Sequence, residues 1–191
     1  MKLRATPSQT IGPFFRIGLV ELYKADIAKH AAGERVVVRG RVVDGKGIGV
    51  ADAIIEIWQA NAHGEYLHPE DTQIQGKIAK DAFTGFGRVP TDEDGLFQFT
   101  TIKPGAVSGP DGKEQAPHLV ISIFMRGLLK GLLTRMYFPD DARNEADFIL
   151  RMIPVERRGT LIAKRLKGKE SGMLEWNVIL QGEDETVFFD C

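Results

Sequence analysis

Short segments of alternating apolar and polar residues, which end at glycine or proline, are the clearest pattern along the chain. Residues 36–43 are rich in valine with arginines between them, and residues 53–58 place Ala53, Ile55 and Ile57 on one face. This two-residue period favours pleated, half-buried strands. The intervening Asp44-Gly45-Lys46-Gly47 supplies the positive-φ positions of a tight turn. We therefore predict two strands joined by a turn, with a polar loop after residue 58 that carries Gln59, His63 and Tyr66.

The rest of the chain continues in the same way. We predict a strand over 96–101 with its phenylalanines inward, strands over 117–125 and 132–138, and a closing hairpin of 160–166 with 174–180 about Gly168-Lys169. Residues 67–90 and 108–115 show no sustained period and are predicted to be loops. Helices are few: a weak one over 21–32, a short one over 140–152, and a turn or short helix over 154–158. The fold class is all-β, a two-sheet β-sandwich with long connecting loops and few short helices, in a single domain over 1–191.

An arm of about residues 1–35 precedes the first strand. It contains T-P-S-Q-T-I-G-P-F-F at 6–15, where two prolines and a glycine predict an extended or turn-rich conformation without a helix. The arm also carries Ile11, Phe14 and Phe15, which a free tail would have no reason to expose. We expect it to pack against the core of this chain or against a neighbouring chain.

Composition and charge exclude several classes of protein. The 191 residues are 43% hydrophobic and carry a net charge of −1, so a nucleic-acid partner is not expected. The apolar run 119–125 is interrupted by Ser122 and is far too short to span a membrane. The first residues lack the apolar segment of a signal peptide, and the single cysteine, Cys191, cannot form an internal disulfide. The sequence predicts a cytoplasmic protein with no membrane partner.

Candidate chemistry is sparse. The chain has no P-loop, dinucleotide-binding fingerprint, nucleophile elbow or zinc motif. The remaining candidates are the four histidines and three tyrosines, since a catalytic metal site needs about three protein ligands that converge. Spacing alone leaves two interpretations open, a metal site or hydrogen-bonded core residues. The candidates are His30, His63, His68, His118, Tyr23, Tyr66 and Tyr137.

Several long motifs in fixed order resemble the intradiol ring-cleavage dioxygenases. They are E-I-W-Q-A-N-A-H-G-E-Y at 56–66, T-D-E-D-G-L-F-Q-F-T-T-I-K-P-G at 91–105 and A-P-H-L-V-I-S-I-F at 116–124. The resemblance implies a two-sheet sandwich and a non-haem ferric ion held by two tyrosines and two histidines. By motif position, Tyr66 and His118 match the first tyrosine and the first histidine. Val107 and Val120 stand where the other two ligands are expected, and Gln115 stands where an arginine is expected.

With these departures, the chain resembles the members of the family that do not hold iron themselves. Valine has no donor atom, so we assign no metal ligand and no catalytic residue to this chain, and Tyr66 and His118 are predicted to be remnants with structural hydrogen bonds. The resemblance implies that a homologous beta chain binds the Fe(III) and that the pair cleaves protocatechuate with O2 to 3-carboxy-cis,cis-muconate. Thr10, Gly12, Pro13, Phe14 and Arg126 are expected to face the partner's substrate pocket.

Two other interpretations stay open at this point. The chain could be a non-catalytic β-sandwich that binds or scaffolds other molecules, or a homo-oligomeric enzyme with a remodelled metal site. Co-purification with an iron-bearing homologue and iron quantitation of the isolated chain distinguish them. A buried apolar interface with the partner is also expected, because the sequence contains more phenylalanines outside the strand cores than one small sandwich hides: Phe14, Phe15, Phe83, Phe86, Phe188 and Phe189.

Overall fold

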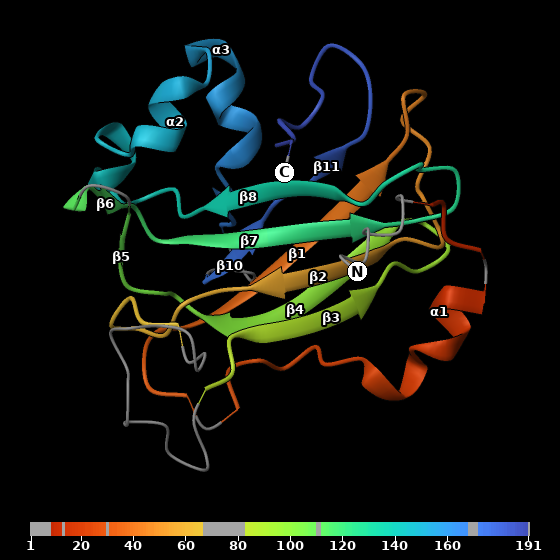
Figure 1. Cartoon of the computed structure of the whole chain (residues 1–191), viewed down its shortest axis with the longest axis horizontal. Helices are drawn as coiled ribbons and strands as arrows, with labels where there is room; N and C mark the ends of the chain where they lie inside the picture. Colours follow the sequence, from red (N-terminus) through yellow and green to blue (C-terminus); the bar gives the residue numbers. More distant parts are fainter. Residues whose placement is uncertain are drawn as a thin grey trace, which may run out of the picture.

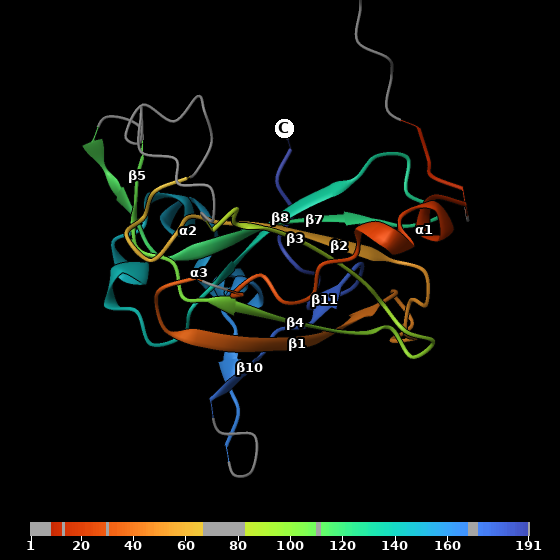
Figure 2. The ribbon, with the colours of Figure 1, turned by 90° about the horizontal axis from the view of Figure 1, so that it is seen from below.

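Two facing β-sheets form the body of the molecule (Figures 1 and 2). The computed structural model describes residues 9–12, 14–29, 31–66, 83–109, 112–167 and 172–190. The four-stranded sheet has the order β3-β2-β7-β8 and is antiparallel throughout. Its strands are β2 (Ile54–Trp58), β3 (Phe86–Pro90), β7 (His118–Phe124) and β8 (Leu132–Tyr137). This sheet lies at the front in Figure 1.

The second sheet is centred on β1 (Arg35–Val43). β4 (Leu96–Ile102) pairs antiparallel along one edge of β1. β10 (Met173–Glu175) and β11 (Val178–Ile179) pair parallel along its other edge, and β9 (Lys164–Arg165) pairs with β10. A separate two-stranded ribbon consists of β5 (Val107–Ser108) and β6 (Glu114–Gln115). The predicted all-β sandwich is confirmed.

Alternating residues from both sheets fill the core. Ile55, Ile57, Leu119, Ile121 and Ile123 point inward from the four-stranded sheet and are fully buried. The other sheet contributes valines of β1 together with Phe97 and Phe99, which are 4% and 1% exposed. The inward phenylalanines and the inward isoleucines of 53–58 are therefore as the sequence predicted, because a strand with one buried face must alternate.

β3 is the main element that the sequence analysis missed, since it lies inside the predicted loop 67–90. Gly87 sits in the middle of this strand, and a Cβ there would lie 2.3 Å from Ile27 Cδ1. The glycine therefore allows the arm to approach the sheet closely, although glycine in a sequence normally indicates a loop. The part of the loop prediction over 67–82 lies outside the described residues.

The prediction of no helix over 6–15 is wrong for residues 14–15, which begin a helix. α1 (Phe14–Gly18) and a 3₁₀ turn, η1 (Val20–Leu22), replace both the extended arm and the weak helix predicted over 21–32. The helix begins after the last proline of the arm, so that no proline interrupts it. Beyond η1 the chain is extended: Lys24 bridges to Arg88 of β3 and Asp26 to Thr100 of β4. The arm thereby ties the two sheets together along one side.

Short helices cover one end of the four-stranded sheet beside β8 (Figure 1). They are η3 (Ala142–Glu145), α2 (Phe148–Met152), α3 (Val155–Arg158) and η4 (Gly159–Leu161). The single helix predicted over 140–152 is divided at Asp147, whose side chain caps α2 through Leu150 N. A second small core forms beneath these helices from Ala116, Tyr137, Leu150, Ile153 and Leu161.

The closing hairpin is shorter than predicted. In the hairpin, Lys164 pairs with Glu175 and Arg165 pairs with Leu174. Val178–Ile179 pair with β1 instead. The predicted turn at Gly168-Lys169 lies outside the described residues. In the part of the chain that the structure describes, no helix is long and apolar enough to cross a membrane.

Candidate functional site

His118 begins β7 and lies on the outer face of the four-stranded sheet, opposite Tyr137 of β8. The side chain is 2% exposed, and its Nδ1 lies 2.7 Å from the carbonyl oxygen of Ala116. A carbonyl only accepts, so Nδ1 carries the proton. Burial is the main cause that lowers the pKa of His118 to about 4, and the positive charge of Arg135 adds to it. His118 is thus a neutral imidazole at neutral pH, and its bond to Ala116 is a structural hydrogen bond of the kind that the sequence analysis predicted.

Asp147 organises a buried polar network next to this histidine. Its carboxylate is fully buried and accepts hydrogen bonds from Ala116 N (2.8 Å), Leu150 N (2.9 Å) and the hydroxyl of Tyr137 (3.3 Å). Burial is the first cause that raises the pKa of Tyr137 well above its usual value, so the phenol stays protonated. The network fixes the start of β7, the end of β8 and the first turn of α2 relative to one another.

Arg135 extends the network onto the outer face of the sheet. Its Nη1 donates to the side-chain oxygen of Gln115 (2.8 Å) and to the hydroxyl of Tyr137 (3.3 Å). Gln115 lies in β6, directly opposite Val107 of β5. A permanent cation therefore lies beside two of the positions that the family resemblance singles out.

Tyr66 follows the loop 59–66, whose shape depends on two residues. The side-chain oxygen of Asn61 accepts from His63 N (2.8 Å) and Glu65 N (3.1 Å). Gly64 has a φ of +80°, and a Cβ there would lie 1.8 Å from the carbonyl oxygen of Ala106. The loop is therefore pressed against the segment before β5. Tyr66 stacks on Trp58, with ring centroids 5.8 Å apart and an angle of 9° between the planes.

The four positions at which the resemblance expects ligands meet in one region, but their donors do not fit a ferric ion. Val120 lies between Trp58 and Arg135 on the same face, and Val107 lies opposite Gln115. Two of the four positions are hydrocarbon. Among the described residues, no three His, Cys, Asp or Glu side chains are grouped to hold a metal ion. No chemical step through iron follows from this chain's own residues.

The expected substrate-binding residues lie at the other end of the sheet. Thr10 Oγ1 accepts from Gly127 N (3.3 Å), which brings the arm beside Arg126 in the turn after β7. Arg126 is 63% exposed and its Nε donates to Asp52 in an ion pair. Gly12 is exposed and Phe14 is 81% exposed, whereas Pro13 lies outside the described residues.

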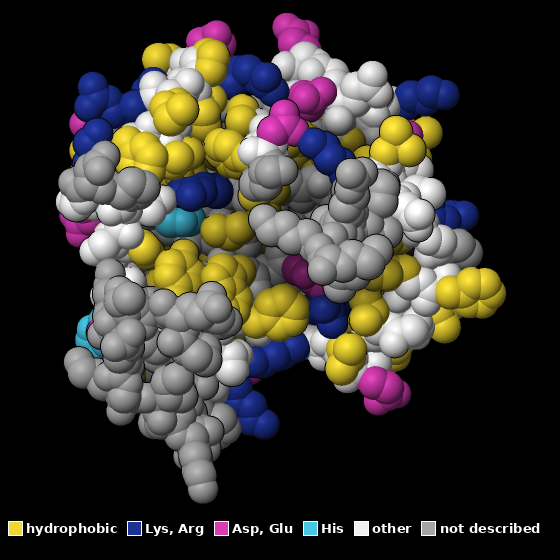
Figure 3. Space-filling model, viewed as in Figure 1, with side chains coloured by type: hydrophobic (Ala, Val, Ile, Leu, Met, Phe, Trp, Pro, Cys, Tyr) yellow, Lys and Arg dark blue, Asp and Glu magenta, His cyan; other side chains and the backbone are white. Residues whose placement is uncertain are grey.

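Of the six phenylalanines expected at an interface, most pack on this chain. Phe15 contacts Phe124, with ring centroids 5.8 Å apart, and Phe86 lies under the guanidinium of Arg88. Phe83 and Phe188 pack against the main core, and Phe189 packs against the second core. Phe14 is the member that remains exposed. Apolar side chains nevertheless gather over the outer face of the four-stranded sheet (Figure 3).

The length of β7 separates the region around His118 from the expected substrate-binding residues Thr10, Phe14 and Arg126. His118 and Phe124 stand at its ends, about 20 Å apart at roughly 3.3 Å per residue. α1 of the arm and β5 accordingly lie at opposite ends of the molecule in both ribbon views. Thr10, Phe14 and Arg126 therefore cannot line a pocket around His118 of the same chain.

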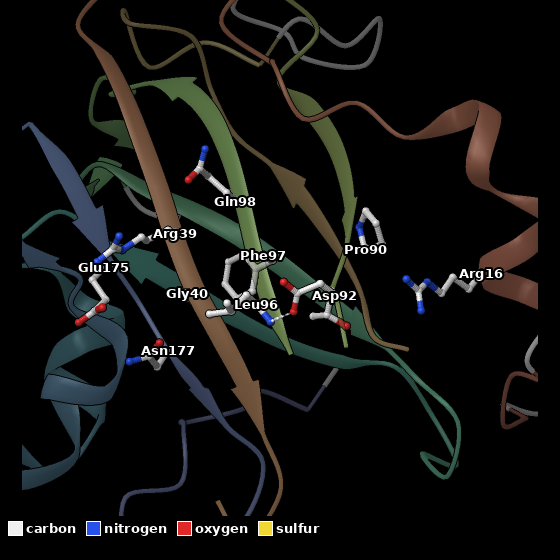
Figure 4. Close-up of a pocket in the computed structure, with 11 residues that line it drawn as sticks. Arg16, Arg39, Gly40, Pro90, Asp92, Leu96, Phe97, Gln98, Glu175 and Asn177 are labelled. Atoms are coloured by element: carbon white, nitrogen blue, oxygen red, sulfur yellow. Dashed lines mark hydrogen bonds between the residues drawn. The ribbon is translucent and has the colours of Figure 1, made fainter. Parts of the chain in front are cut away.

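A hollow of about 700 Å³ lies elsewhere, along β1, β4 and the rim of β3 (Figure 4). Three of its polar residues hold the fold together through hydrogen bonds. Asp92 accepts from Leu96 N (2.8 Å), Asn177 accepts from Arg41 N (2.9 Å) and Arg16 donates to Ala51 O (2.6 Å). The hollow contains none of the residues predicted from the sequence, and we assign it no chemistry.

Arg135 and Asp147 are the residues of this region that the sequence analysis did not single out. In the sequence, Arg135 is an ordinary charge inside a strand and Asp147 one of several acids in a predicted helix. The pairing of β7 with β8 places Arg135 on the face of the remnant histidine, and the hydrogen bonds of Asp147 to Ala116 N and to the Tyr137 hydroxyl place Asp147 beside it.

Comparisons with known proteins agree with this geometry. A family model described as dioxygenase matches residues 21–182. The protocatechuate 3,4-dioxygenase alpha chain of Burkholderia cepacia is 41% identical over 202 aligned residues, which cover 98% of both chains. The beta chain from that organism is 38% identical over 173 residues, covering 84% of this chain and 73% of its own. The solved intradiol ring-cleavage dioxygenase of Tetranychus urticae superposes with a TM-score of 0.62 at 18% identity, over 93% of this chain and 94% of its own.

Proposed function

Because the chain belongs to the intradiol ring-cleavage dioxygenase family, we propose that it is the alpha chain of a heteromeric protocatechuate 3,4-dioxygenase. A homologous beta chain holds the non-haem Fe(III), and the pair cleaves protocatechuate with O2 to 3-carboxy-cis,cis-muconate. The observation that carries the proposal is the pair of valines, Val107 and Val120, at two of the four expected ligand positions. A cytoplasmic location stays a prediction that rests on the single cysteine.

The arrangement of the outer face explains how a chain without iron contributes to the reaction. Two homologous sandwiches that pair through this face about an approximate two-fold axis bring opposite ends of their sheets together. The arm end of this chain then lies over the metal end of its partner. The residues that lie far from His118 in their own chain are thus close to the partner's substrate.

At that place this chain supplies shape and charge. Iron held by the partner would supply a Lewis acid and a template for the catechol. Arg126 carries a permanent positive charge with five N–H donors, one of which its ion pair with Asp52 uses. It orients the carboxylate of the substrate, while the exposed ring of Phe14 and the backbone at Gly12 cover the aromatic face and exclude water.

Co-expression with the beta chain tests the assignment. The native complex is expected to contain both chains, with iron in proportion to the beta chain. The alpha chain alone is expected to be colourless and inactive. A red-brown, active preparation of the isolated chain would contradict the proposal and favour a remodelled metal site. Absence of any iron-bearing homologue in the complex would favour the scaffold interpretation.

Arg126→Ala tests the substrate contact. In the assembled enzyme, loss of a charge-assisted contact of about 1–3 kcal/mol is expected to raise KM for protocatechuate by about 5- to 150-fold. Arg165→Ala is the matched control, because Arg165 is an exposed arginine of β9 in the other sheet. An unchanged KM for Arg126→Ala would place Arg126 outside the pocket.

A further inference from the structure

We propose that Asp52 is a positioning residue for the substrate, because its ion pair with Arg126 holds the guanidinium in the orientation that binds the carboxylate of protocatechuate. The inference rests on the proposed function, since it takes Arg126 as the residue that contacts this carboxylate. It adds a second residue, which does not touch the substrate and which the sequence analysis did not single out. Asp52 thereby takes part in the selection of catechols that carry a carboxylate.

The register of the four-stranded sheet brings Asp52 and Arg126 together. β2 and β7 pair antiparallel as far as Ile54 and Phe124, and the same register continued by two residues places Asp52 opposite Arg126. Nε of Arg126 donates to Oδ2 of Asp52 between the two turns. Directly opposed side chains of an antiparallel pair are close enough to interact. The ion pair is therefore a consequence of the strand pairing.

The turn that carries Asp52 is held from two sides. Thr91, directly after β3, is fully buried, and its hydroxyl accepts a hydrogen bond from Ala53 N (3.0 Å). On the other side, Arg16 of α1 donates to Ala51 O (2.6 Å). The side chain of Asp52 is 22% exposed. The carboxylate of Asp52 thus projects from a backbone that both the sheet and the arm hold in place.

The arm also holds the turn that carries Arg126. Gly127 N donates to Thr10 Oγ1 (3.3 Å), and Phe15 of the arm lies against Phe124 at the end of β7. These contacts place the backbone, but the guanidinium stands at the end of a long side chain that is 63% exposed. Such a side chain has many accessible rotamers, and the ion pair with Asp52 restricts them.

The main effect of this restriction is on binding, because an exposed ion pair contributes little to the stability of a fold. A guanidinium is planar, so a hydrogen bond at Nε of Arg126 fixes its plane and the direction of Nη1 and Nη2. A carboxylate can accept two parallel hydrogen bonds from a guanidinium oriented in this way. A side chain that is ordered before the substrate arrives also loses less entropy on binding. The negative charge of Asp52 opposes binding only weakly, because solvent and salt screen charges at exposed positions.

Asp52→Ala in the assembled enzyme tests the proposal. Loss of the ordered rotamer of Arg126 is expected to raise KM for protocatechuate by about 2- to 12-fold. Catechol, which has no carboxylate, is measured as a competitive inhibitor, and its inhibition constant is expected to stay unchanged. Asp140→Ala, which removes an exposed ion pair with Arg165, is the matched control and is expected to change neither constant. An unchanged or lowered KM in Asp52→Ala would overturn the proposal, as would an equal weakening of both molecules, which indicates a structural disturbance.

Two further variants show whether Asp52 acts through Arg126. Asp52→Asn keeps an oxygen that accepts from Nε, so its KM is expected to lie closer to the wild-type value than that of Asp52→Ala. In the background of Arg126→Ala, Asp52→Ala is expected to raise KM no further. Equal KM values in the two Asp52 variants, or an additive effect in the double variant, would contradict a positioning role.

Folding is checked by thermal unfolding, and the midpoints of both Asp52 variants are expected to stay near that of the wild type. The outcome also separates the two proposals. An unchanged KM in Arg126→Ala would refute the substrate contact on which both proposals depend. A raised KM in Arg126→Ala, together with no effect of Asp52→Ala, would refute this inference alone.

Discussion

Replacing Asp147 by alanine is expected to cost the chain about 3–5 kcal/mol of its free energy of unfolding. The carboxylate is fully buried and satisfies two buried backbone amides, Ala116 N and Leu150 N, besides the Tyr137 hydroxyl. Each buried donor left without a partner costs about 1–3 kcal/mol, and part of this is offset because a charge no longer has to be buried. The loss is therefore larger than the roughly 1 kcal/mol of an ordinary helix cap.

Asp147→Asn refines the test. The amide keeps one oxygen for Leu150 N but turns an NH2 group toward another donor, so an intermediate loss of about 1–3 kcal/mol is expected. Urea unfolding of the full chain, followed by tryptophan fluorescence, measures both variants against Asp184→Ala. Asp184 is exposed, and its replacement should change the free energy by less than about 0.5 kcal/mol. A loss below about 1 kcal/mol for Asp147→Ala, with an unchanged m-value, would refute the reasoning.

The remaining predictions concern pH and backbone geometry. The pKa of His118 is about 4 in the folded chain and about 6.5 when unfolded, so above pH 6.5 it adds no pH dependence. Between pH 6.5 and 4 the unfolded chain alone binds the proton, and stability falls by up to about 3 kcal/mol as the pH falls. His118→Gln should remove this part of the slope in unfolding titrations, and His63→Gln, at an exposed position, should retain it; equal slopes in both would contradict the assignment. Gly64→Ala should cost more than about 2 kcal/mol in thermal unfolding, since its Cβ would meet Ala106 O. Gly47→Ala, with a φ of +75° and open space, should cost only about 1–2 kcal/mol, and an equal loss in both would mean that the contact is unimportant.

The strands with a clean alternation could be predicted from the sequence, because burial of one face fixes the period. Phe97 and Phe99 in β4 and Ile55 and Ile57 in β2 are examples. β3 could not be predicted, because Gly87 is required by the approach of the arm, and that contact is between residues far apart in the chain. The division of the helix predicted over 140–152 could not be predicted either. In the sequence, an aspartate that caps a helix, such as Asp147, looks the same as an aspartate inside one.

For the site, motif order identified which positions matter, and strand register showed what they do. Sequence alone predicted that Tyr66 and His118 are remnants, and the structure supplies the partners of His118. The sequence could not show that Arg135 faces Val120, because the pairing of β7 with β8 depends on the length of the turn between them. A slip of one residue would have pointed Arg135 into the core.

The separation of the arm from the remnant site has a consequence for how the two chains of such an enzyme diverge. Under the proposed function, with the two sandwiches joined about an approximate two-fold axis, each active site needs the metal end of one chain and the arm end of the other. A chain that loses its ligands at positions 107 and 120 keeps its arm, because the arm serves the other site. Its own metal end is then free to change, and there Arg135 donates to the hydroxyl of the buried Tyr137, which donates in turn to Asp147. Under the proposed function, substitutions at Thr10, Phe14 or Arg126 therefore act on catalysis, whereas those at Tyr66, His118 or Arg135 act on the stability of this chain.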